Sequence, residues 1–253
     1  KASKAVAAQG MLRRAEALVA NLETVRQKDK VAKLRFPTPA ACGKTPLMGE
    51  DLSKSYGSLE VFTGVDLAID RGSRVCILGL NGAGKTTMLK ILAGVLESDT
   101  GVINPGHGLK LGYYAQEHES LDFERSVLEN MLSSGEKITE QQARSVLGSF
   151  LFVGDDVMKP VKVLSGGERT RLALATLVVG SANVLLLDEP TNNLDPASRD
   201  EILGALTEYQ GAVILVSHDE GAVRALNPDR VLLLPDGDED IWNEEYFDLI
   251  TLE

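Results

Sequence analysis

A glycine-rich turn between two apolar runs is the feature that most constrains what this chain of 253 residues can fold into. The turn, Gly79–Thr87 (GLNGAGKTT), follows the alternating apolar run Arg74–Leu78 and opens the amphipathic run Met88–Leu96. A strand, such a turn and a helix N-terminus make an anion site, because successive backbone N–H groups point at a phosphate with the helix dipole behind them. The spacing fits G-x-x-x-x-G-K-[ST] and not the dinucleotide fingerprint, which needs its second glycine where Asn81 stands. The turn therefore predicts a nucleoside triphosphate site.

Residue types within the turn predict individual roles. Lys85 would reach the β- and γ-phosphates, and the hydroxyl of Thr86 would bind Mg²⁺. The other residues of the turn would surround the phosphates: Gly79, Leu80, Asn81, Gly82, Ala83, Gly84 and Thr87. The alternative, an accidental glycine turn, is disfavoured because a strand and a helix flank the motif in the right order.

The composition excludes several classes of protein. Apolar residues make up 43% and charged residues 25% of the chain, which is ordinary for a globular protein. The longest apolar stretches, such as Ala212–Val216, are too short to cross a bilayer, so we expect no membrane segment. Cys42 and Cys76 make no disulfide framework and fit a reducing compartment, so we expect a cytoplasmic protein. Three scattered histidines give no reason to expect a zinc site.

The net charge of −11 is unevenly distributed along the chain. Residues 1–46 hold ten Lys/Arg against three Asp/Glu, and the remainder holds 16 against 34. A basic arm of charge +7 therefore precedes a body of charge −18. The acidic body will not coat nucleic acid by itself, whereas the basic arm is able to reach it.

Residues 1–34 predict one long helix, because they contain no proline, a single glycine and many good helix formers. Apolar residues step along it by 4, 3, 4 and 3, which indicates a coiled-coil seam that needs a partner helix. These residues are Met11, Ala15, Leu18, Leu22 and Val25. The alternative is a helix on its own domain with a solvated basic face. Pro37, Pro39 and Gly43 predict a connector, so we expect a linker over 1–46 and a second domain over 47–253.

From residue 47 onward the pattern predicts one α/β domain. Strands are expected near 47–53, 65–69, 74–78, 102–104, 110–115, 184–187, 212–216 and 230–234. A mostly helical block is expected over about 125–160, within a helical subdomain over about 120–180, and further helices from about 166 and after Pro196. Apolar strands that alternate with helices imply a parallel sheet covered on both faces. The acidic tail predicts a short edge strand and a closing helix, packed through Trp242, Tyr246 and Phe247.

Two acids, Asp188 and Glu189, directly follow the buried strand predicted over 184–187. Ligands of parallel sheets collect at this end of the strands. Asp188 would hold hydrated Mg²⁺, and Glu189 would polarise the water that attacks the γ-phosphate. A helix N-cap pair is the alternative, and it is disfavoured because a phosphate loop requires a metal-binding aspartate. His218 follows the next strand and is placed to donate a hydrogen bond to the γ-phosphate, although a lone histidine more often packs or lies on the surface.

A second glycine-led helix start, Leu164–Glu168 (LSGGE), completes an ordered series of motifs. The chain shows in succession GLNGAGKTT, Gln116 after a strand, LSGGE, VLLLDEP, NNLD and SHD. Over residues 47–235 this series resembles the nucleotide-binding domain of the ATP-binding cassette (ABC) superfamily. The resemblance implies ATP and Mg²⁺ as ligands and the α/β fold of a P-loop NTPase. That fold has a mainly parallel core sheet, an antiparallel β part and an inserted helical subdomain, here preceded by the long N-terminal helix.

The resemblance also implies roles for two residues outside the glycine-rich turn. Tyr56 looks like the aromatic residue that stacks on adenine, with packing at a strand end as the alternative. Gln116 resembles the glutamine that contacts Mg²⁺ or the attacking water and links to the helical block. Together with Lys85, Glu189 and His218 it makes up the expected catalytic set.

Two further motifs resemble parts of the family that act across a dimer. Ser165, Gly166, Gly167 and Glu168 resemble the signature that binds the γ-phosphate of a nucleotide held by a different domain. Asn193, Leu194 and Asp195 resemble the loop that crosses the dimer interface. If the phosphate loop and LSGGE lie on opposite sides of one domain, two domains must enclose two nucleotides head to tail. We then expect one copy to bind ATP but to hydrolyse it poorly at low concentration.

Three features resemble the ABC-F group, in which a helical hairpin joins two cassettes and enters the ribosome. PTNNLD (Pro190–Asp195) is close to the PTNHLD of that group, with Asn193 in place of the histidine. The basic helix and its proline-broken connector look like the end of the inter-domain linker, and only about 30 residues separate Lys85 from Gln116. The resemblance implies a second cassette with the C-terminal part of the linker. Its partners would be a further cassette, or a second copy, and the ribosome or its rRNA.

Two other interpretations remain beside this one. The ATPase subunit of a membrane transporter would carry the same motifs and need a membrane partner near Gln116 and the helical block. A nucleotide-gated scaffold without catalysis is disfavoured, because the expected catalytic and metal-binding residues are intact. The motifs do not distinguish a translation factor from a factor that dislodges ribosome-targeting antibiotics.

Overall fold

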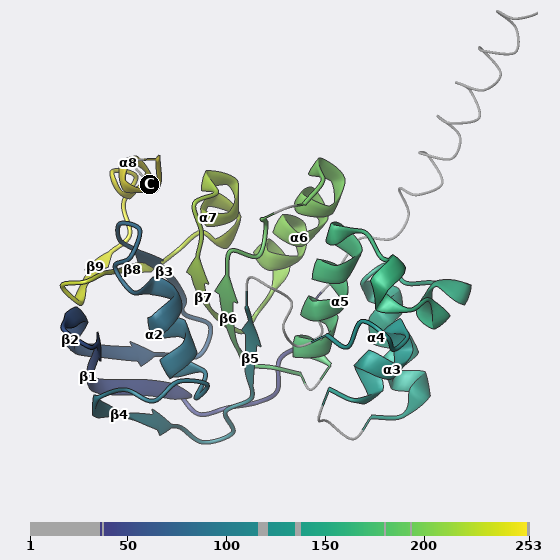
Figure 1. Ribbon diagram of the computed structural model, residues 1–253, viewed down its shortest axis with the longest axis horizontal. Helices are drawn as coiled ribbons and strands as arrows, with labels where there is room; N and C mark the ends of the chain where they lie inside the picture. Colours follow the sequence, from purple (N-terminus) through teal and green to yellow (C-terminus); the bar gives the residue numbers. More distant parts are fainter. Residues whose placement is uncertain are drawn as a thin grey trace, which may run out of the picture. The chain divides into compact units, whose positions relative to one another are not determined.

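Figure 1 shows the computed structural model of the chain, which describes residues 36, 38–115, 121–134, 138–179, 181–192 and 194–251. The chain divides into two compact units, and the described residues all belong to the second, Leu34–Glu253. The helix predicted over 1–34 lies outside the described residues, as do Gln116 and Asn193.

A six-stranded sheet of order β5-β6-β7-β3-β8-β9 forms the centre of this unit. Its strands are β3 (Arg74–Leu78), β5 (Leu111–Tyr114), β6 (Val184–Asp188), β7 (Ala212–Val216), β8 (Arg230–Leu233) and β9 (Asp238–Ile241). The first five strands in this order pair in parallel, and only β9 runs antiparallel, beside β8. The predicted mainly parallel core sheet is therefore confirmed.

Helices cover both faces of this sheet, because β6 and β7 are apolar and buried at almost every position. Leu185 and Leu187 of β6 belong to one core cluster, and Val184 and Leu186 belong to another. The first cluster includes residues of α5 (Gly166–Val178), α6 (Pro196–Glu208) and α7 (Glu220–Leu226). The second includes residues of α2 (Lys85–Leu92), which therefore lies on the opposite face (Figure 1).

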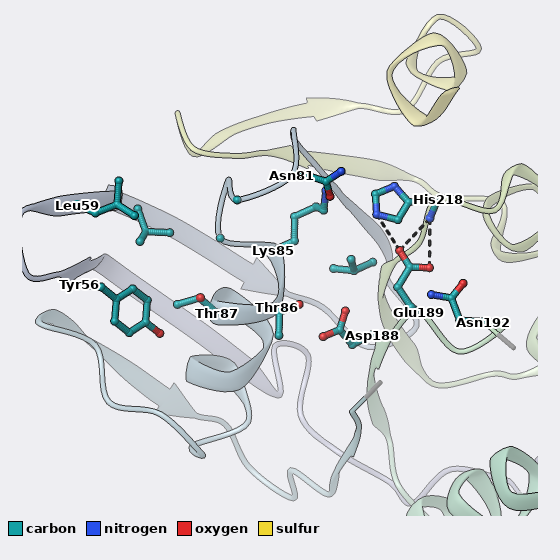
Figure 2. Close-up of a pocket in the computed structure, with 14 residues that line it drawn as sticks. Tyr56, Leu59, Asn81, Lys85, Thr86, Thr87, Asp188, Glu189, Asn192 and His218 are labelled. Atoms are coloured by element: carbon teal, nitrogen blue, oxygen red, sulfur yellow. Dashed lines mark hydrogen bonds and ion pairs between the residues drawn. The ribbon is translucent and has the colours of Figure 1, made fainter. Parts of the chain in front are cut away.

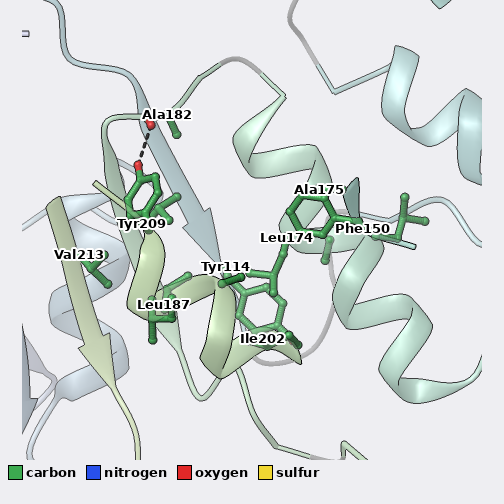
Figure 3. Packing of buried hydrophobic residues seen from close by; sticks show 14 of the residues in the cluster. Tyr114, Phe150, Leu174, Ala175, Ala182, Leu187, Ile202, Tyr209 and Val213 are labelled. Atoms are coloured by element: carbon green, nitrogen blue, oxygen red, sulfur yellow. Dashed lines mark hydrogen bonds between the residues drawn. The ribbon is translucent and has the colours of Figure 1, made fainter. Parts of the chain in front are cut away.

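The first of these cores is closed by aromatic side chains at the ends of helices (Figure 3). Tyr209 caps the C-terminus of α6 and donates a hydrogen bond from its hydroxyl to the carbonyl of Ala182 at 2.6 Å. Phe36, at the beginning of the described chain, packs against Tyr209 and Phe150, with ring centroids 5.4 and 5.8 Å away. Phe36 is thus packed against the end of α6 and against Phe150 in the helical part.

A three-stranded antiparallel sheet of order β2-β1-β4 covers α2 from the other side (Figure 1). Its strands are β1 (Leu47–Tyr56), β2 (Leu59–Ile69) and β4 (Thr100–Pro105). Leu52 and Phe62 of this sheet share a core cluster with Met88 of α2, so the helix is buried between two sheets. The antiparallel β part predicted for the fold is present.

The helical part consists of α3 (Val127–Leu132), α4 (Glu140–Ser149), two 3₁₀ turns (Gly154–Met158 and Val161–Val163) and α5. Each of the three α-helices begins with a capping box, in which a Ser or Thr and the third residue after it exchange hydrogen bonds. These boxes satisfy the free N–H groups of helices that are too short to be stable alone.

Most element positions agree with the sequence predictions, and two differ. β2 begins at Leu59, six residues before the expected strand, and α7 was not predicted at all. The chain closes with the edge strand β9 and with α8 (Tyr246–Thr251), and Trp242 packs edge-on against Phe247 at 5.3 Å, as expected for the tail. Within the described ranges no helix is long and apolar enough to cross a bilayer.

Candidate active site

A cavity of about 380 Å³ lies where the parallel strands end and the glycine-rich turn enters α2 (Figure 2). Its walls come from the β1–β2 hairpin, the start of α2 and the segments that follow β6 and β7. The lining residues are Tyr56, Leu59, Val61, Asn81, Gly82, Gly84, Lys85, Thr86, Thr87, Asp188, Glu189, Asn192, Val216 and His218. The structure thus brings together side chains from four separate parts of the sequence.

The glycine-rich turn is shaped by close contacts with the rest of the protein. Gly84 precedes α2 with φ 96°, in the left-handed region, and a Cβ there would collide with Cγ1 of Val61. No side chain caps the first turn of α2, so its N–H groups remain available to an anion. Lys85 donates a hydrogen bond from Nζ to the carbonyl of Gly79, which holds its ammonium over the turn.

Not every residue of the turn faces the cavity. Asn81, Gly82 and the four residues from 84 to 87 line it, whereas Gly79, Leu80 and Ala83 do not. Leu80 is 68% exposed, and Ala83 packs in the core cluster around α2. Gly79 lies so close to the carbonyl of Leu234 that a Cβ would not fit. Gly79 and Ala83 therefore pack against the folded core, and Leu80 faces solvent.

Asp188 ends β6 as a buried carboxylate, and its Oδ2 has no hydrogen-bond partner among the described residues. Burial raises the pKa of this carboxyl, while the hydrogen bond with Thr86 and the charge of Lys90 act in the opposite direction. A buried carboxylate is costly unless it is paired, and here one of its oxygens has no partner and a hydroxyl lies beside it. These oxygens are suitable ligands for a cation.

The side chains present fit Mg²⁺, which usually takes one or two protein oxygens and completes its shell with water and phosphate. Thr86 and Asp188 supply such oxygens at the phosphate end of the cavity (Figure 2). The described part of the chain contains no group of three His, Cys, Asp or Glu side chains that could hold a metal without water and phosphate.

Glu189 is held in an unusual backbone conformation with a buried side chain. Its φ is 51°, in the left-handed region that costs a non-glycine residue energy, and its N–H donates to the carbonyl of Val216 at 2.9 Å. The carboxylate accepts hydrogen bonds from the N–H of His218 at 3.0 Å and the hydroxyl of Ser217 at 3.3 Å. Burial raises the pKa of Glu189 to about 7, against the effect of these hydrogen bonds. A carboxylate with this pKa is suited to accept a proton near neutral pH.

Tyr56 and Leu59 stand at the other end of the cavity from Glu189 and His218 (Figure 2). They pair across the two-residue turn of the β1–β2 hairpin and leave 52% and 64% of their surfaces exposed. The cavity therefore runs from an exposed apolar end, past a phosphate loop, to a buried acidic end. This order matches the base, phosphates and attacking water of a nucleoside triphosphate.

The LSGGE motif lies elsewhere, at the start of α5, and contributes nothing to the cavity wall described above. Ser165 caps α5, with its hydroxyl accepting from the N–H of Glu168 at 3.2 Å. A Cβ at Gly167 would come within 2.9 Å of Asp195 Oδ2, so this motif touches the N-cap of α6. Gly167 of the predicted signature and Asp195 of the predicted interface loop are thus close to one another, and neither lines the cavity.

Comparison with known proteins decides the family. Residues 62–192, about half of the chain, match the family model described as ABC transporter. The chain belongs to this family. As an ABC cassette with the corresponding fold, it is an ATPase domain.

The cassette is similar to several curated bacterial proteins. It is 39% identical over 233 residues to the putative ATP-binding protein YdiF of Bacillus subtilis, covering 89% of the cassette chain and 36% of that protein. It is 38% identical over 234 residues to the probable ATP-binding protein YheS of Escherichia coli K12, covering 92% and 36%. It is 38% identical over 213 residues to the ATP-binding protein Uup of Haemophilus influenzae, covering 81% and 33%. The chain spans about a third of the length of these relatives.

Solved structures show the same fold. A dimeric bacterial ABC transporter cassette superposes with a TM-score of 0.68 at 24% identity, covering 78% of this chain and 99% of the other. A dimeric post-hydrolysis state of an ATP-binding cassette, bound to ADP and Pi, superposes with a TM-score of 0.67 at the same identity and coverage. Both confirm the P-loop ABC cassette fold.

Four residues of the cavity were not predicted from the sequence. Leu59, Val61 and Val216 are apolar strand residues, and which face of a strand they occupy depends on a register that the sequence does not fix. Asn192 lies inside the quoted PTNNLD motif, and its N–H donates to the carbonyl of Glu189 at 3.2 Å. The position of Asn192 within this motif was the sequence feature that could have identified it as a cavity residue.

Proposed function

We propose that this cassette hydrolyses ATP in a site that is completed by a second cassette, and that it forms part of an ABC-F protein acting on the ribosome. The observation that carries the first part is the placement of the two glycine-led helices. The turn before α2 lines the cavity, whereas the LSGGE motif at the start of α5 contributes no residue to its lining, so the two motifs do not enclose one nucleotide within one copy. The two solved neighbours are dimers, which supports the same arrangement here.

Within one copy, the polar and aromatic residues named below each take a part of the reaction. The α2 N–H groups and Lys85 bind the phosphates, and Tyr56 stacks on the adenine. Glu189 orients the attacking water and accepts its proton, and His218 donates a hydrogen bond to the γ-phosphate. Thr86 and Asp188 would hold Mg²⁺, which when bound neutralises charge that develops on the phosphates.

The remaining assignments rest on the sequence resemblance. Gln116 and Asn193 lie outside the described residues, so their proposed roles, near the metal and at the dimer interface, rest on the resemblance alone. Ser165, Gly166, Gly167 and Glu168 would bind the γ-phosphate of the nucleotide on the facing cassette, with Asp195 beside them. The motif forms the N-terminus of α5, which supports this role because the dipole of a helix favours an anion at its N-terminus.

Sedimentation of a hydrolysis-deficient variant tests the shared site. The chain with Glu189→Gln is expected to be monomeric with Mg-ADP and dimeric with Mg-ATP, because only the triphosphate bridges two copies. Adding Ser165→Arg should keep ATP binding and abolish the dimer. A Glu189→Gln chain that stays monomeric while saturated with ATP would overturn the proposal. So would a wild-type turnover per molecule that stays constant on dilution into the nanomolar range.

Two sequence features support the ribosome as the target. The basic arm over 1–46 carries a charge of +7, whereas the body carries −18, and PTNNLD is close to the ABC-F motif. The proposed domains are this linker arm, followed by the cassette over 47–253 with a helical subdomain over about 120–180. A chain that spans about a third of its relatives leaves room for a first cassette and the rest of the linker.

Co-sedimentation tests this assignment. The Glu189→Gln chain should pellet with 70S ribosomes in ATP, and binding should weaken steeply with salt because phosphate contacts release counterions. Replacing Arg26, Lys28 and Lys30 by glutamine should reduce the pelleted fraction and flatten the salt dependence. A chain that stays in the supernatant at low salt would remove the ribosome proposal. Capture of the same chain by an ABC membrane subunit would favour the transporter alternative.

A further inference from the structure

The end of β1 that carries Tyr56 is paired on one side only, with β2, and has no strand partner on the side of β4. β1 pairs with β4 only as far as Ser53, opposite Thr100, and its register with β2 shifts between Lys54 and Ser55. Beyond Ser53, the segment that follows α2 takes the place of the missing strand partner. The N–H of Asp99 donates to the carbonyl of Ser53 at 2.8 Å.

The side chain of Asp99 continues this attachment toward Tyr56. Its Oδ2 accepts a hydrogen bond from the N–H of Ser55, and its Oδ1 accepts one from Nζ of Lys54, both at 2.7 Å. Lys54 also donates to the carbonyl of Glu97 at 2.9 Å. The hydrogen bond from Lys54, and next the one from Ser55, hold the pKa of Asp99 below its usual value. The Lys54 side chain is only 13% exposed, which is low for a lysine.

These contacts attach Tyr56 to the far end of the phosphate-binding helix. α2 starts at Lys85 and ends at Leu92, and a glycine turn follows it, with Gly94 at φ 70°. The N–H groups of residues 95 and 96 both donate to the carbonyl of Lys90, which fixes the direction in which the chain leaves the helix. Residues 97–99 then reach β1. A continuous run of described contacts therefore joins the phosphate loop to the strand end that bears Tyr56.

Lys54 is also close to the aromatic ring itself. Its Nζ lies 5.8 Å from the ring centroid of Tyr56, within the range of a cation–π contact. Neither Lys54 nor Asp99 is among the residues that line the cavity. An effect of the pair on a nucleotide would therefore be indirect, and Tyr56 is a lining residue that Lys54 contacts.

We propose that Lys54 and Asp99 are positioning residues, which fix the ring of Tyr56 relative to the phosphate loop and so determine how tightly the site holds the base of its nucleotide. The inference rests on the proposed stacking of adenine on Tyr56. In this view an ion pair outside the cavity sets the distance between Tyr56 and the phosphate loop, which are the two ends of the nucleotide site.

Calorimetric titration with two ligands tests the inference. Mg-ADP contacts both ends of the site, whereas inorganic tripolyphosphate contacts only the phosphate loop. Tyr56→Leu is expected to raise the Kd for ADP about tenfold, the scale of one lost base stack. Lys54→Met, which keeps the length of the side chain, should raise it about threefold to tenfold. Both variants should bind tripolyphosphate as the wild type does, which also shows that they are folded.

Lys159→Met is the matched control, because it makes the same substitution and removes one ion pair, with Asp156, in the helical part. It should bind both ligands like the wild type. Asp99→Asn is the second test of the pair, since Lys54 and Ser55 donate to different oxygens and one of these becomes an NH2 group that cannot accept. It should weaken ADP binding without affecting tripolyphosphate.

The double variant Lys54→Met/Tyr56→Leu separates positioning from general weakening of the fold. If Lys54 acts through the ring, the double variant should bind ADP like Tyr56→Leu alone. Additive losses, or a loss of tripolyphosphate binding in Lys54→Met, would overturn the inference. So would unchanged ADP binding in Lys54→Met while Tyr56→Leu is impaired. If Tyr56→Leu itself binds ADP normally, the stacking assignment fails as well, and the sedimentation test of the shared site is unaffected.

Discussion

Glu189 and His218 contact each other through two different parts of the histidine: the backbone N–H of His218 donates to Oε1 of Glu189 at 3.0 Å, and the ring Nε2 lies 3.2 Å from the same oxygen. The backbone contact orients the carboxylate whatever the ring does. The ring is therefore able to leave for a phosphate without releasing the carboxylate from its place. Each residue can consequently be altered and its contribution measured separately.

Glu189→Gln should lower kcat by about 10²- to 10⁴-fold, because glutamine accepts the same hydrogen bond but not a proton. The Kd for ATP should remain within about twofold, since binding depends on the phosphate loop. Phosphate release and calorimetry measure the two quantities. Hydrolysis at more than half the wild-type rate would show that the base is another group.

His218→Ala should lower kcat about 10- to 100-fold while the Glu189 carboxylate keeps its backbone hydrogen bond. The matched variant is Ser217→Ala, which removes the longer, 3.3 Å contact to the same carboxylate and no group near the phosphate end. Its kcat should fall less than that of His218→Ala. Equal losses in both variants would mean that the ring acts only by orienting Glu189.

Gly84→Ala should abolish nucleotide binding, because alanine at φ 96° is strained and its Cβ would collide with Val61. Gly204→Ala provides the contrast. Gly204 is exposed in the interior of α6, and a Cβ there meets no atom within 4 Å. This second variant should bind nucleotide normally and gain about 0.5–1 kcal/mol in the free energy of unfolding. Urea unfolding and calorimetry check both, and normal ADP affinity in Gly84→Ala would contradict the account of the turn.

Asp219→Asn should show a pH-dependent loss of stability. Asp219 accepts two hydrogen bonds from the guanidinium of Arg199, at 2.7 and 2.5 Å, and this contact holds the pKa of the carboxyl below its usual value. Because the folded pKa is depressed, the ion pair stabilises the protein fully above the unfolded pKa of about 3.9. That stabilisation disappears as the pH falls through the still lower pKa of the folded state.

At pH 7 the variant should therefore be about 1–3 kcal/mol less stable than the wild type, and the difference should shrink as the pH falls below the unfolded pKa of about 3.9. Asparagine retains the cap on α7, where Asp219 Oδ1 accepts from the N–H of Gly221, so the difference reports on the ion pair. Urea unfolding across this range measures it. A difference that stays constant with pH would assign the effect to packing.

The sequence predicted those elements whose pattern is complete within a few residues. β3 and β7 have the expected bounds, because each is a short run of mainly apolar residues that ends where polar or glycine-rich sequence begins. The acids at 188 and 189 were located for the same reason, since they interrupt an apolar strand at its end. In the glycine-rich turn both the residue types and their spacing match a phosphate-binding motif. The nucleotide site could therefore be predicted without knowledge of the other residues that line it.

Long-range geometry explains what could not be predicted. α7 has only seven residues, too few for a helical period to stand out, and depends on packing of Ala222 and Val223 against the sheet. β2 begins early because it pairs with β1 through an irregular register that local patterning does not encode. Whether LSGGE shares a face with the phosphate loop could only be stated conditionally, since it depends on strand order in the sheet.

The support that Val61 and Leu234 give to the glycine-rich turn has a thermodynamic consequence. The curvature of the turn is imposed by the hairpin behind Gly84 and by the carbonyl beside Gly79, both of which belong to the folded core. Its conformational entropy is therefore given up during folding, before any ligand arrives. Association with a phosphate then carries little ordering penalty, so a loop rich in the most flexible residue type behaves as a rigid receptor.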